Sequence, residues 1–274
     1  AWPRDATHDA GRRREGQTSL VLSEDALRRA LAAAGLEAPV RYEDEVGSTN
    51  DLALELARSG APEWTLVAAG HQTAGRGRLG RSWLDRPGAA LMFSLVLRPQ
   101  GLSPARVGLL PLLAGVAAAE GCLEAGAARV TCKWPNDLLV GEAKAGGILA
   151  ESRVEGGRLV HVVLGVGINL REPPAGVPGA AGVGDVEPEA VLSGFLRAFR
   201  PRYQPSHPAF VGAVLAAYRR VSATLGRRVR ATTTRGATIE GLAVDVREDG
   251  GLVLETDGGM ALVAFGEVHH LDPA

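Results

Sequence analysis

The chain has 274 residues and a mass near 28.5 kDa, with 46% hydrophobic and 22% charged residues, a composition typical of one large folded domain or of one domain with a small appendage. Its net charge of −1 argues against binding to nucleic acid through bulk positive charge. No uninterrupted apolar run reaches the ~18 residues of a membrane helix, no signal peptide is evident, and Cys122 and Cys132 are too few for a disulfide framework. We therefore expect a cytoplasmic protein with no membrane contact.

The basic residues are strongly skewed toward arginine. Of the 30 lysines and arginines, 28 are arginine, and the two lysines, Lys133 and Lys144, fall within twelve residues of each other. Lysine carries a compact ammonium where arginine carries a planar fork, so the two are not interchangeable in a binding site. We therefore expect a functional reason for at least one of the two lysines.

The N-terminal part predicts a tail and two helices. Residues 1–19 are polar and are predicted to be a disordered tail. Ser23 is a helix cap with Gly35 as the stop, and a second helix is expected from Ser48-Thr49 to Gly60.

The middle of the chain alternates apolar runs with turn residues. Ser103-Pro104 predicts one long apolar helix to about Gly126. Strands are expected at 65–69, 91–97, 130–132, 137–140, 147–154 and 159–168, followed by a Gly/Pro-rich loop at 171–187 and helices at about 188–200 and 208–225.

The pattern changes at Gly226. Residues 227–272 have no helical period and consist of short apolar runs separated by glycine-containing turns. This predicts a small all-β unit of four or five strands.

An arginine-rich loop is the first candidate for chemistry. It reads Gly75-Arg76-Gly77-Arg78-Leu79-Gly80-Arg81 and is followed by Trp83. Glycines allow a ligand to approach the backbone closely, and guanidinium groups bind phosphates and carboxylates through paired hydrogen bonds. The loop does not match the Walker pattern, because it lacks that motif's lysine. The alternative to a binding function is a mobile surface loop.

Four further segments carry polar residues in suggestive positions. Lys133-Trp134-Pro135-Asn136-Asp137 joins two strands, and Lys144 precedes the glycines that enter the next strand, Gly146 and Gly147. Gly165-Val166-Gly167-Ile168-Asn169 ends an apolar strand, and Ser48-Thr49-Asn50 begins a helix. Taken singly, these segments are also explained by a structural turn, a solvated lysine, strand packing and a helix cap, respectively.

Taken together and in this order, the five segments closely resemble the biotin–protein ligase family, over about four-fifths of the chain from Ser48 onward. The resemblance implies an α+β fold, in which a class II synthetase-like catalytic domain with a mixed sheet flanked by helices (residues 20–226) precedes a small SH3-like β-barrel (residues 227–274). It implies activation of biotin by ATP to biotinyl-5′-AMP with release of pyrophosphate. Transfer of biotin to a lysine of the biotin carboxyl carrier domain of an acyl-CoA carboxylase would follow.

The resemblance also implies the roles of individual residues. Lys144 and Arg78 would be catalytic, because two anions meet in the adenylation step and need positive charge. The implied biotin-binding residues are Ser48, Thr49, Asn50, Gln72, Arg76, Gly77, Arg78, Lys144 and Gly147. The implied ATP- and adenylate-binding residues are Arg76, Arg78, Trp83, Asn136, Asp137 and Asn169. Asp137 would also help to bind Mg²⁺ brought in with ATP, and the arginine loop would order over the ligand.

Two alternatives stay open at this point. A lipoate or octanoate ligase shares the adenylation chemistry but typically carries an Arg-Arg-x-Ser-Gly-Gly-Gly string that this chain does not have. A catalytically inactive biotin-binding regulator would not need Arg76, Arg78 and Lys144. With a single helix predicted before Ser48, we expect no DNA-binding winged helix and no DNA partner, and either a monomer or a weak, ligand-dependent homodimer.

Overall fold

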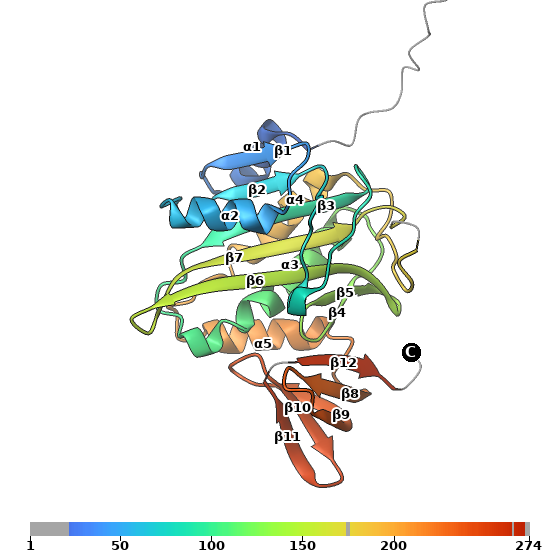
Figure 1. Ribbon diagram of the computed structural model, residues 1–274. Coiled ribbons are helices and arrows are strands. Elements are labelled where there is room, and N and C mark those ends of the chain that lie inside the picture. The colour runs from blue at the N-terminus through green and yellow to red at the C-terminus, as the bar shows by residue number, and fades with distance from the viewer. Residues whose placement is uncertain (1–21, 174–175, 265, 272–274) are drawn as a thin grey trace, which may run out of the picture.

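The computed structural model describes residues 22–173, 176–264 and 266–271, and the predicted tail at 1–19 lies outside them. A seven-stranded sheet forms the centre of the larger part, with the strand order β1-β2-β3-β7-β6-β5-β4 (Figure 1). Only β1 and β2 among these neighbours run parallel, so the sheet is mixed, as predicted. Its strands are β1 (Val40–Glu43), β2 (Leu66–Ala69), β3 (Ala90–Leu97), β4 (Thr131–Lys133), β5 (Asp137–Val140), β6 (Ala143–Glu155) and β7 (Arg158–Asn169).

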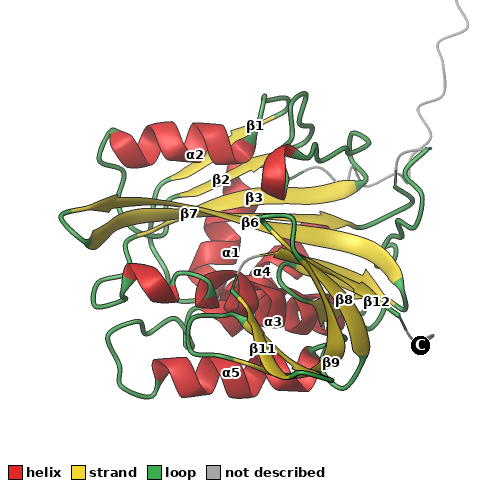
Figure 2. Ribbon diagram, turned by 60° about the horizontal axis from the view of Figure 1, so that its bottom comes forward, coloured by secondary structure: helices red, strands yellow, loops and turns green. Residues whose placement is uncertain are grey.

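Helices cover both faces of this sheet (Figure 2). On one face lies α2 (Thr49–Arg58), which packs Ala53 and Ala57 against valines of β2, β3 and β7. The other face carries the larger core beneath α1 (Glu24–Ala33), α3 (Leu109–Glu124), α4 (Pro188–Phe199) and α5 (Phe210–Val221). The predicted α+β class, with a mixed sheet between helices, is confirmed.

Two of the predicted helices end or begin differently. The segment predicted as one helix from Ser103 is a 3₁₀ turn, Pro104–Arg106, followed by α3, and Gly108 stands between them. A Cβ at Gly108 would lie 2.5 Å from the carbonyl oxygen of Asp249, so a tertiary contact that the sequence does not reveal requires this glycine. The last helix stops at Val221 rather than near 225, because Ser222 leaves the helix to bridge to Cys132 of β4.

The segment Pro104–Glu124 has the length and hydropathy of a membrane span. Two-thirds of its most apolar window is nevertheless buried inside the protein, where α3 contacts α4, α5 and the sheet. Its apolar character is therefore explained by its place as the core helix.

The predicted all-β unit is a five-stranded antiparallel sheet with the order β11-β10-β9-β8-β12. Its strands are β8 (Arg228–Thr233), β9 (Thr238–Val246), β10 (Leu252–Thr256), β11 (Gly259–Val263) and β12 (Gly266–His270). Its inward residues, such as Val229 and Leu254, belong to the same buried cluster as the core of the larger part.

The second sheet is attached to the larger part at the Trp134 turn. The buried Trp134 indole Nε1 donates to the carbonyl of Gly250 at 2.9 Å, and its backbone N–H donates to Thr224 Oγ1 at 3.0 Å. Gly250 has φ +87° and packs directly on Gly108. The Trp-Pro pair of the central motif thus fixes the second sheet beside the arginine loop.

Candidate active site

Three glycines on two adjacent strands form the floor of a cavity that opens to solvent. A Cβ at Gly165 would overlap Asn50 Oδ1, and a Cβ at Gly167, two residues on and on the same face of β7, would lie 2.9 Å from the Trp83 ring. Gly147 on β6 faces the same space, where a Cβ would meet Lys144 and Trp83 at an ordinary 3.7 Å. The glycine pair of β7 therefore makes room for two predicted site residues.

The cavity brings the predicted site together from α2, the arginine loop, the Trp134 turn, β6 and β7. The predicted residues that line it are Ser48, Thr49, Asn50, Gln72, Arg76, Gly77, Arg78, Trp83, Asn136, Asp137, Lys144 and Gly147.

Asn169 and Lys133 are not among the described residues that line the cavity. Asn169 is buried at the end of β7, and its amide donates to the carbonyl of Ala181 at 3.2 Å. Lys133 lies on the outer strand β4, opposite Asp137 in the register. The structure therefore separates the two lysines that the sequence placed together.

One end of the cavity is polar but uncharged and is built on the N-terminus of α2. Gln72 Oε1 accepts from the Thr49 backbone N–H at 2.7 Å and from Thr49 Oγ1 at 3.0 Å. Ser48 occupies the cap position, but its side chain makes no cap hydrogen bond within the described part of the chain. The Ser48 hydroxyl therefore lines the cavity and does not serve as the helix cap that the structural alternative predicts.

Ser94 supports this end from below and was missed by the sequence analysis. Its fully buried hydroxyl donates to Asn50 Oδ1 at 2.7 Å and lies 2.9 Å from Thr49 Oγ1. A single hydroxyl in the otherwise apolar strand Leu91 to Leu97 was the available signal. Its role emerges only when α2 is packed on β3.

Asp85 was also missed. Its side chain is fully buried; Oδ1 accepts from the Gln72 backbone N–H at 3.2 Å, and Oδ2 lies 2.9 Å from His71 Nδ1. Asp85 lies close after the arginine loop in the sequence, and this position was the available signal for a contact with the residues just before the loop. Asp85 fixes the backbone that presents the Gln72 side chain.

The opposite end of the cavity is charged. Lys144 Nζ lies 2.6 Å from Asp137 Oδ1, and both side chains are partly exposed to the cavity. A β-bulge between Leu138 and Leu139 shifts the pairing of β5 and β6. Since a bulge inserts one residue, it places Lys144 and Gly147, three positions apart, on the same face of the sheet as Asp137.

Arg78 closes the wall between this end and the second sheet. Its Nη1 donates to Asn136 Oδ1 at 3.2 Å and to the carbonyl of Gly266 at 3.3 Å. Burial lowers the pKa of the guanidinium, and the nearby Glu267 and Asp137 carboxylates oppose that shift. An arginine remains charged at physiological pH even so, and this one is held over the cavity.

Glu267 on β12 is a further residue that the sequence analysis missed. It lines the cavity and forms an ion pair with Arg81 of the loop. It lies nearly two hundred residues further along the chain, so only the docking of the second sheet reveals its place.

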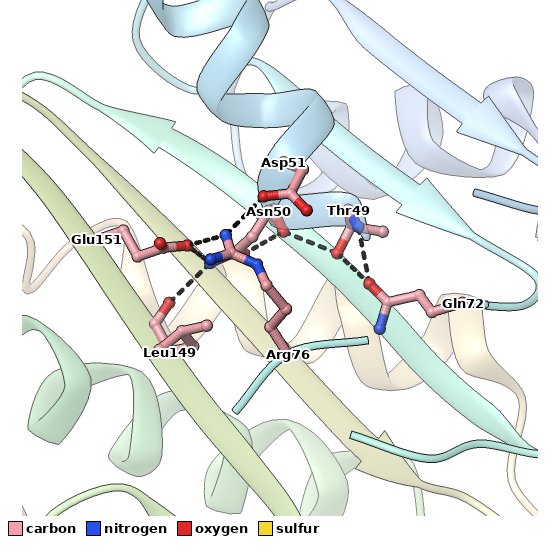
Figure 3. Close-up of polar contacts among 8 residues, drawn as sticks. Thr49, Asn50, Asp51, Gln72, Arg76, Leu149 and Glu151 are labelled. Atoms are coloured by element: carbon pink, nitrogen blue, oxygen red, sulfur yellow. Dashed lines mark hydrogen bonds and ion pairs between the residues drawn. The ribbon is translucent and has the colours of Figure 1, made fainter. Parts of the chain in front are cut away.

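Arg76 points its guanidinium away from this charged end. Its Nη2 lies 2.7 Å from Asp51 Oδ1 and 2.6 Å from Glu151 Oε2 (Figure 3). Trp83 covers the glycine floor, and its buried indole Nε1 has no hydrogen-bond partner among the described residues. Among the described residues that line the cavity, the loop therefore supplies Trp83, with its unpartnered indole N–H, and the half-buried Arg78, while Arg76 and Arg81 are paired with carboxylates.

Comparisons with known proteins agree with this architecture. Residues 44–169 match the model of the biotin/lipoate A/B protein ligase family, and residues 224–271 match that of the biotin protein ligase C-terminal domain. The chain is 33% identical over 258 residues to the bifunctional ligase/repressor BirA of Bacillus subtilis, covering 90% of this chain and 78% of that protein. It is 35% identical over 240 residues to the biotin–[acetyl-CoA-carboxylase] ligase of Mycobacterium tuberculosis, covering 83% and 87%.

A solved structure shows the same arrangement of elements. The biotin protein ligase of Aquifex aeolicus in complex with biotin and ATP has a TM-score of 0.66 to this chain at 27% identity. The match covers 85% of this chain and 98% of that one.

Proposed function

The chain belongs to the biotin protein ligase family, and we propose that it activates biotin with ATP to biotinyl-5′-AMP and transfers the biotin to a lysine of a carboxylase carrier domain. The observation that carries this proposal is a single cavity with two chemically different ends. One end offers uncharged hydrogen-bonding groups, and the other offers Lys144 and Arg78.

The uncharged end suits the ureido ring of biotin. A ureido group has one acceptor and two donors, and all of them need partners when they leave water. Ser48, Thr49 and Gln72 supply hydroxyl and amide groups there, and Asn50 is held in place by Ser94. We propose that these residues, with Gly77 and the stem of Arg76 above them, bind the head of biotin.

The charged end suits the reacting groups. The biotin carboxylate attacks the α-phosphorus of ATP, the bond to the β-phosphate oxygen breaks, and pyrophosphate leaves with its electron pair. We propose that the Lys144 ammonium lies between the carboxylate and the α-phosphate, and that Arg78 covers the adenylate from the side of the second sheet. Both would offset negative charge that increases in the transition state. Trp83 and Asn136 line the remaining wall, where the nucleotide would lie.

Mg²⁺ would come with ATP and not be held by a resident protein site. No group of three or more His, Cys, Asp or Glu side chains suitable for a metal occurs among the described residues. Mg²⁺ in nucleotide sites typically uses one or two carboxylates plus phosphate oxygens, and Asp137 provides one carboxylate in the cavity. Asp137 fits that role, and the bound ion would neutralise the leaving pyrophosphate.

The second reaction transfers the biotinyl group. The neutral ε-amine of the acceptor lysine attacks the mixed anhydride, an amide bond forms, and AMP leaves with the proton passed to solvent. The relatives that are named for acetyl-CoA carboxylase indicate the class of acceptor. We place the reaction in the cytoplasm, where ATP and carrier domains are available.

Pyrophosphate exchange into ATP tests the proposal. Exchange that depends on biotin, and not on lipoate at the same concentration, is the expected result. Exchange with lipoate alone would identify the chain as a lipoate ligase. The match of residues 224–271 to a biotin protein ligase domain does not support that alternative. The absence of exchange with either acid would contradict the catalytic roles of Lys144 and Arg78.

A further inference from the structure

Arg76 is predicted to bind adenylate, but the structure gives its guanidinium two carboxylate partners outside the charged end. Nη2 contacts Asp51 on α2 and Glu151 on β6 at 2.7 and 2.6 Å. These are three different segments of the chain, drawn together in Figure 3. With two carboxylates against one guanidinium, this corner carries a net charge of −1 and would repel a phosphate.

Glu151 connects the arginine to the uncharged end of the cavity. Its Oε2 accepts from Arg76 and also from Asn50 Nδ2 at 2.9 Å. The other side of the Asn50 amide accepts from the buried Ser94 hydroxyl, which in turn lies 2.9 Å from Thr49 Oγ1. A continuous series of hydrogen bonds therefore runs from Arg76 to the groups proposed to bind the ureido ring.

The same series returns to the loop. Thr49 donates to Gln72, which lies four residues before Arg76, so the loop is fixed to the protein body at both positions. Between them, Gly75 packs against the Trp83 carbonyl and cannot accept a side chain. The loop segment from Gln72 to Arg76 is thus attached to the protein body at both of its ends.

We propose that Asp51 and Glu151 are positioning residues that hold Arg76, and with it the loop, over the head of bound biotin; we name Arg76, Asp51, Glu151 and Asn50 the Arg76 latch. Arg76 then acts on biotin retention through the loop and does not contact the phosphate. The inference rests on the proposed function, because it assigns biotin to this end of the cavity.

The latch predicts a kinetic signature. Glu151→Gln keeps the shape and an acceptor for Asn50 but removes the charge that Arg76 needs. Losing a charge-assisted hydrogen bond in a partly exposed network changes an equilibrium by about 5- to 30-fold. We expect the dissociation of biotin to accelerate and the KM for biotin to rise by about that factor, while kcat at saturating biotin stays near the wild-type value.

Dissociation of radiolabelled biotin from the full chain, chased with unlabelled biotin, measures this effect directly. The variants are Glu151→Gln, Arg76→Gln and the double variant, with Glu55→Gln as a matched control that removes an exposed carboxylate from the same helix as Asp51. The latch requires the double variant to release biotin no faster than Arg76→Gln alone. Raising KCl should accelerate release from the wild type, and should do so less for Glu151→Gln, in which Arg76 keeps only its ion pair with Asp51.

Two results would overturn the latch, and a third would overturn the proposed function. If the increases in biotin dissociation rate of the two single variants multiply in the double variant, Arg76 and Glu151 act independently. If Glu151→Gln releases biotin at the same rate as Glu55→Gln, the contact between Arg76 and Glu151 does not contribute to biotin retention. A wild-type chain that binds no biotin and shows no biotin-dependent pyrophosphate exchange would instead contradict the proposed function itself.

Discussion

Lys144 Nζ lies 2.6 Å from Asp137 Oδ1 across the β5–β6 pair, at the one place where a bulge shifts the register of those strands. The bulge points Lys144 into the cavity. Lys133, the other lysine, lies on β4 outside the lining. The two lysines of the chain therefore form a natural pair of test and control positions.

Lys144→Gln should reduce biotin-dependent pyrophosphate exchange by about 10²- to 10³-fold, the usual cost of removing one preorganised donor from a developing charge. Lys133→Gln should change the exchange rate by less than about threefold, because Lys133 is not among the residues that line the cavity, and a substitution away from such a site usually changes stability little. Equal losses in the two variants would contradict the assignment of Lys144.

Arg78→Gly should release the adenylate into solution. The variant loses the hydrogen bonds to Asn136 and to the carbonyl of Gly266, so the loop keeps only the Arg81–Glu267 ion pair as a side-chain contact with the second sheet among the described residues. Free adenylate acylates accessible amines without selection, so biotin should appear on bystander proteins such as serum albumin. Arg86→Gly, a change at an exposed arginine shortly after this loop, is the control and should label carrier domains alone. If Arg78→Gly still biotinylated only carrier domains, Arg78 would not be needed to retain the adenylate.

Gly165→Ala should raise the KM for biotin by more than about tenfold, because the new methyl group would overlap Asn50 Oδ1 and force this side chain from Ser94 and Glu151. Gly147→Ala adds the same methyl group to the same floor at an ordinary 3.7 Å from Lys144 and Trp83. Its effect should be smaller. Steady-state kinetics measures the KM for biotin of each variant, and thermal unfolding shows whether each variant is folded. Equal KM values in the two variants would contradict the claim that Gly165 makes room for the Asn50 side chain.

Much of this architecture follows from local sequence. The Ser23 side chain caps α1 as predicted, the Glu155-Gly156-Gly157 turn joins two long strands, and the β-rich texture after Gly226 becomes the second sheet. Each of these depends on neighbours in sequence, such as a cap, a turn or an alternating pattern. The grouping of the motif residues in one site was predicted in a different way, from a family resemblance and not from local pattern.

The residues that sequence reasoning missed are those whose partners are distant. Ser94 sits in an apolar strand, Glu151 near the middle of a long hairpin, and Glu267 in the second sheet. Apart from the lone hydroxyl of Ser94 in its apolar strand, nothing local distinguishes them from ordinary strand residues. The docking of α2, the arginine loop and the second sheet gives each one its contact, and the same docking makes Arg76 a partner of carboxylates.

Alkaline pH should destabilise the fold. Burial raises the pKa of the Cys122 and Cys132 thiols to about 12, and it also raises the pKa of the Tyr203 and Tyr218 hydroxyls. Above pH ~9 the unfolded chain loses thiol protons that the folded chain retains, so the free energy of unfolding should fall as pH rises from about 9 toward 12. Urea titrations across this range measure it. Cys132→Ala should flatten the slope, and an unchanged slope would contradict the contribution of this thiol.

The scarcity of lysine should protect the enzyme from its own intermediate. Escaped adenylate can acylate only the amines of Lys133, Lys144 and the chain terminus, and Lys144 is held by Asp137. In the Arg78→Gly background, mass spectrometry should therefore find little self-labelling while an added bystander protein is heavily labelled. Adding Arg86→Lys to that background installs an exposed amine five residues after the arginine loop and should create a new labelled site at position 86. Self-labelling that is heavy before this change, or absent after it, would show that lysine content does not determine where the adenylate reacts.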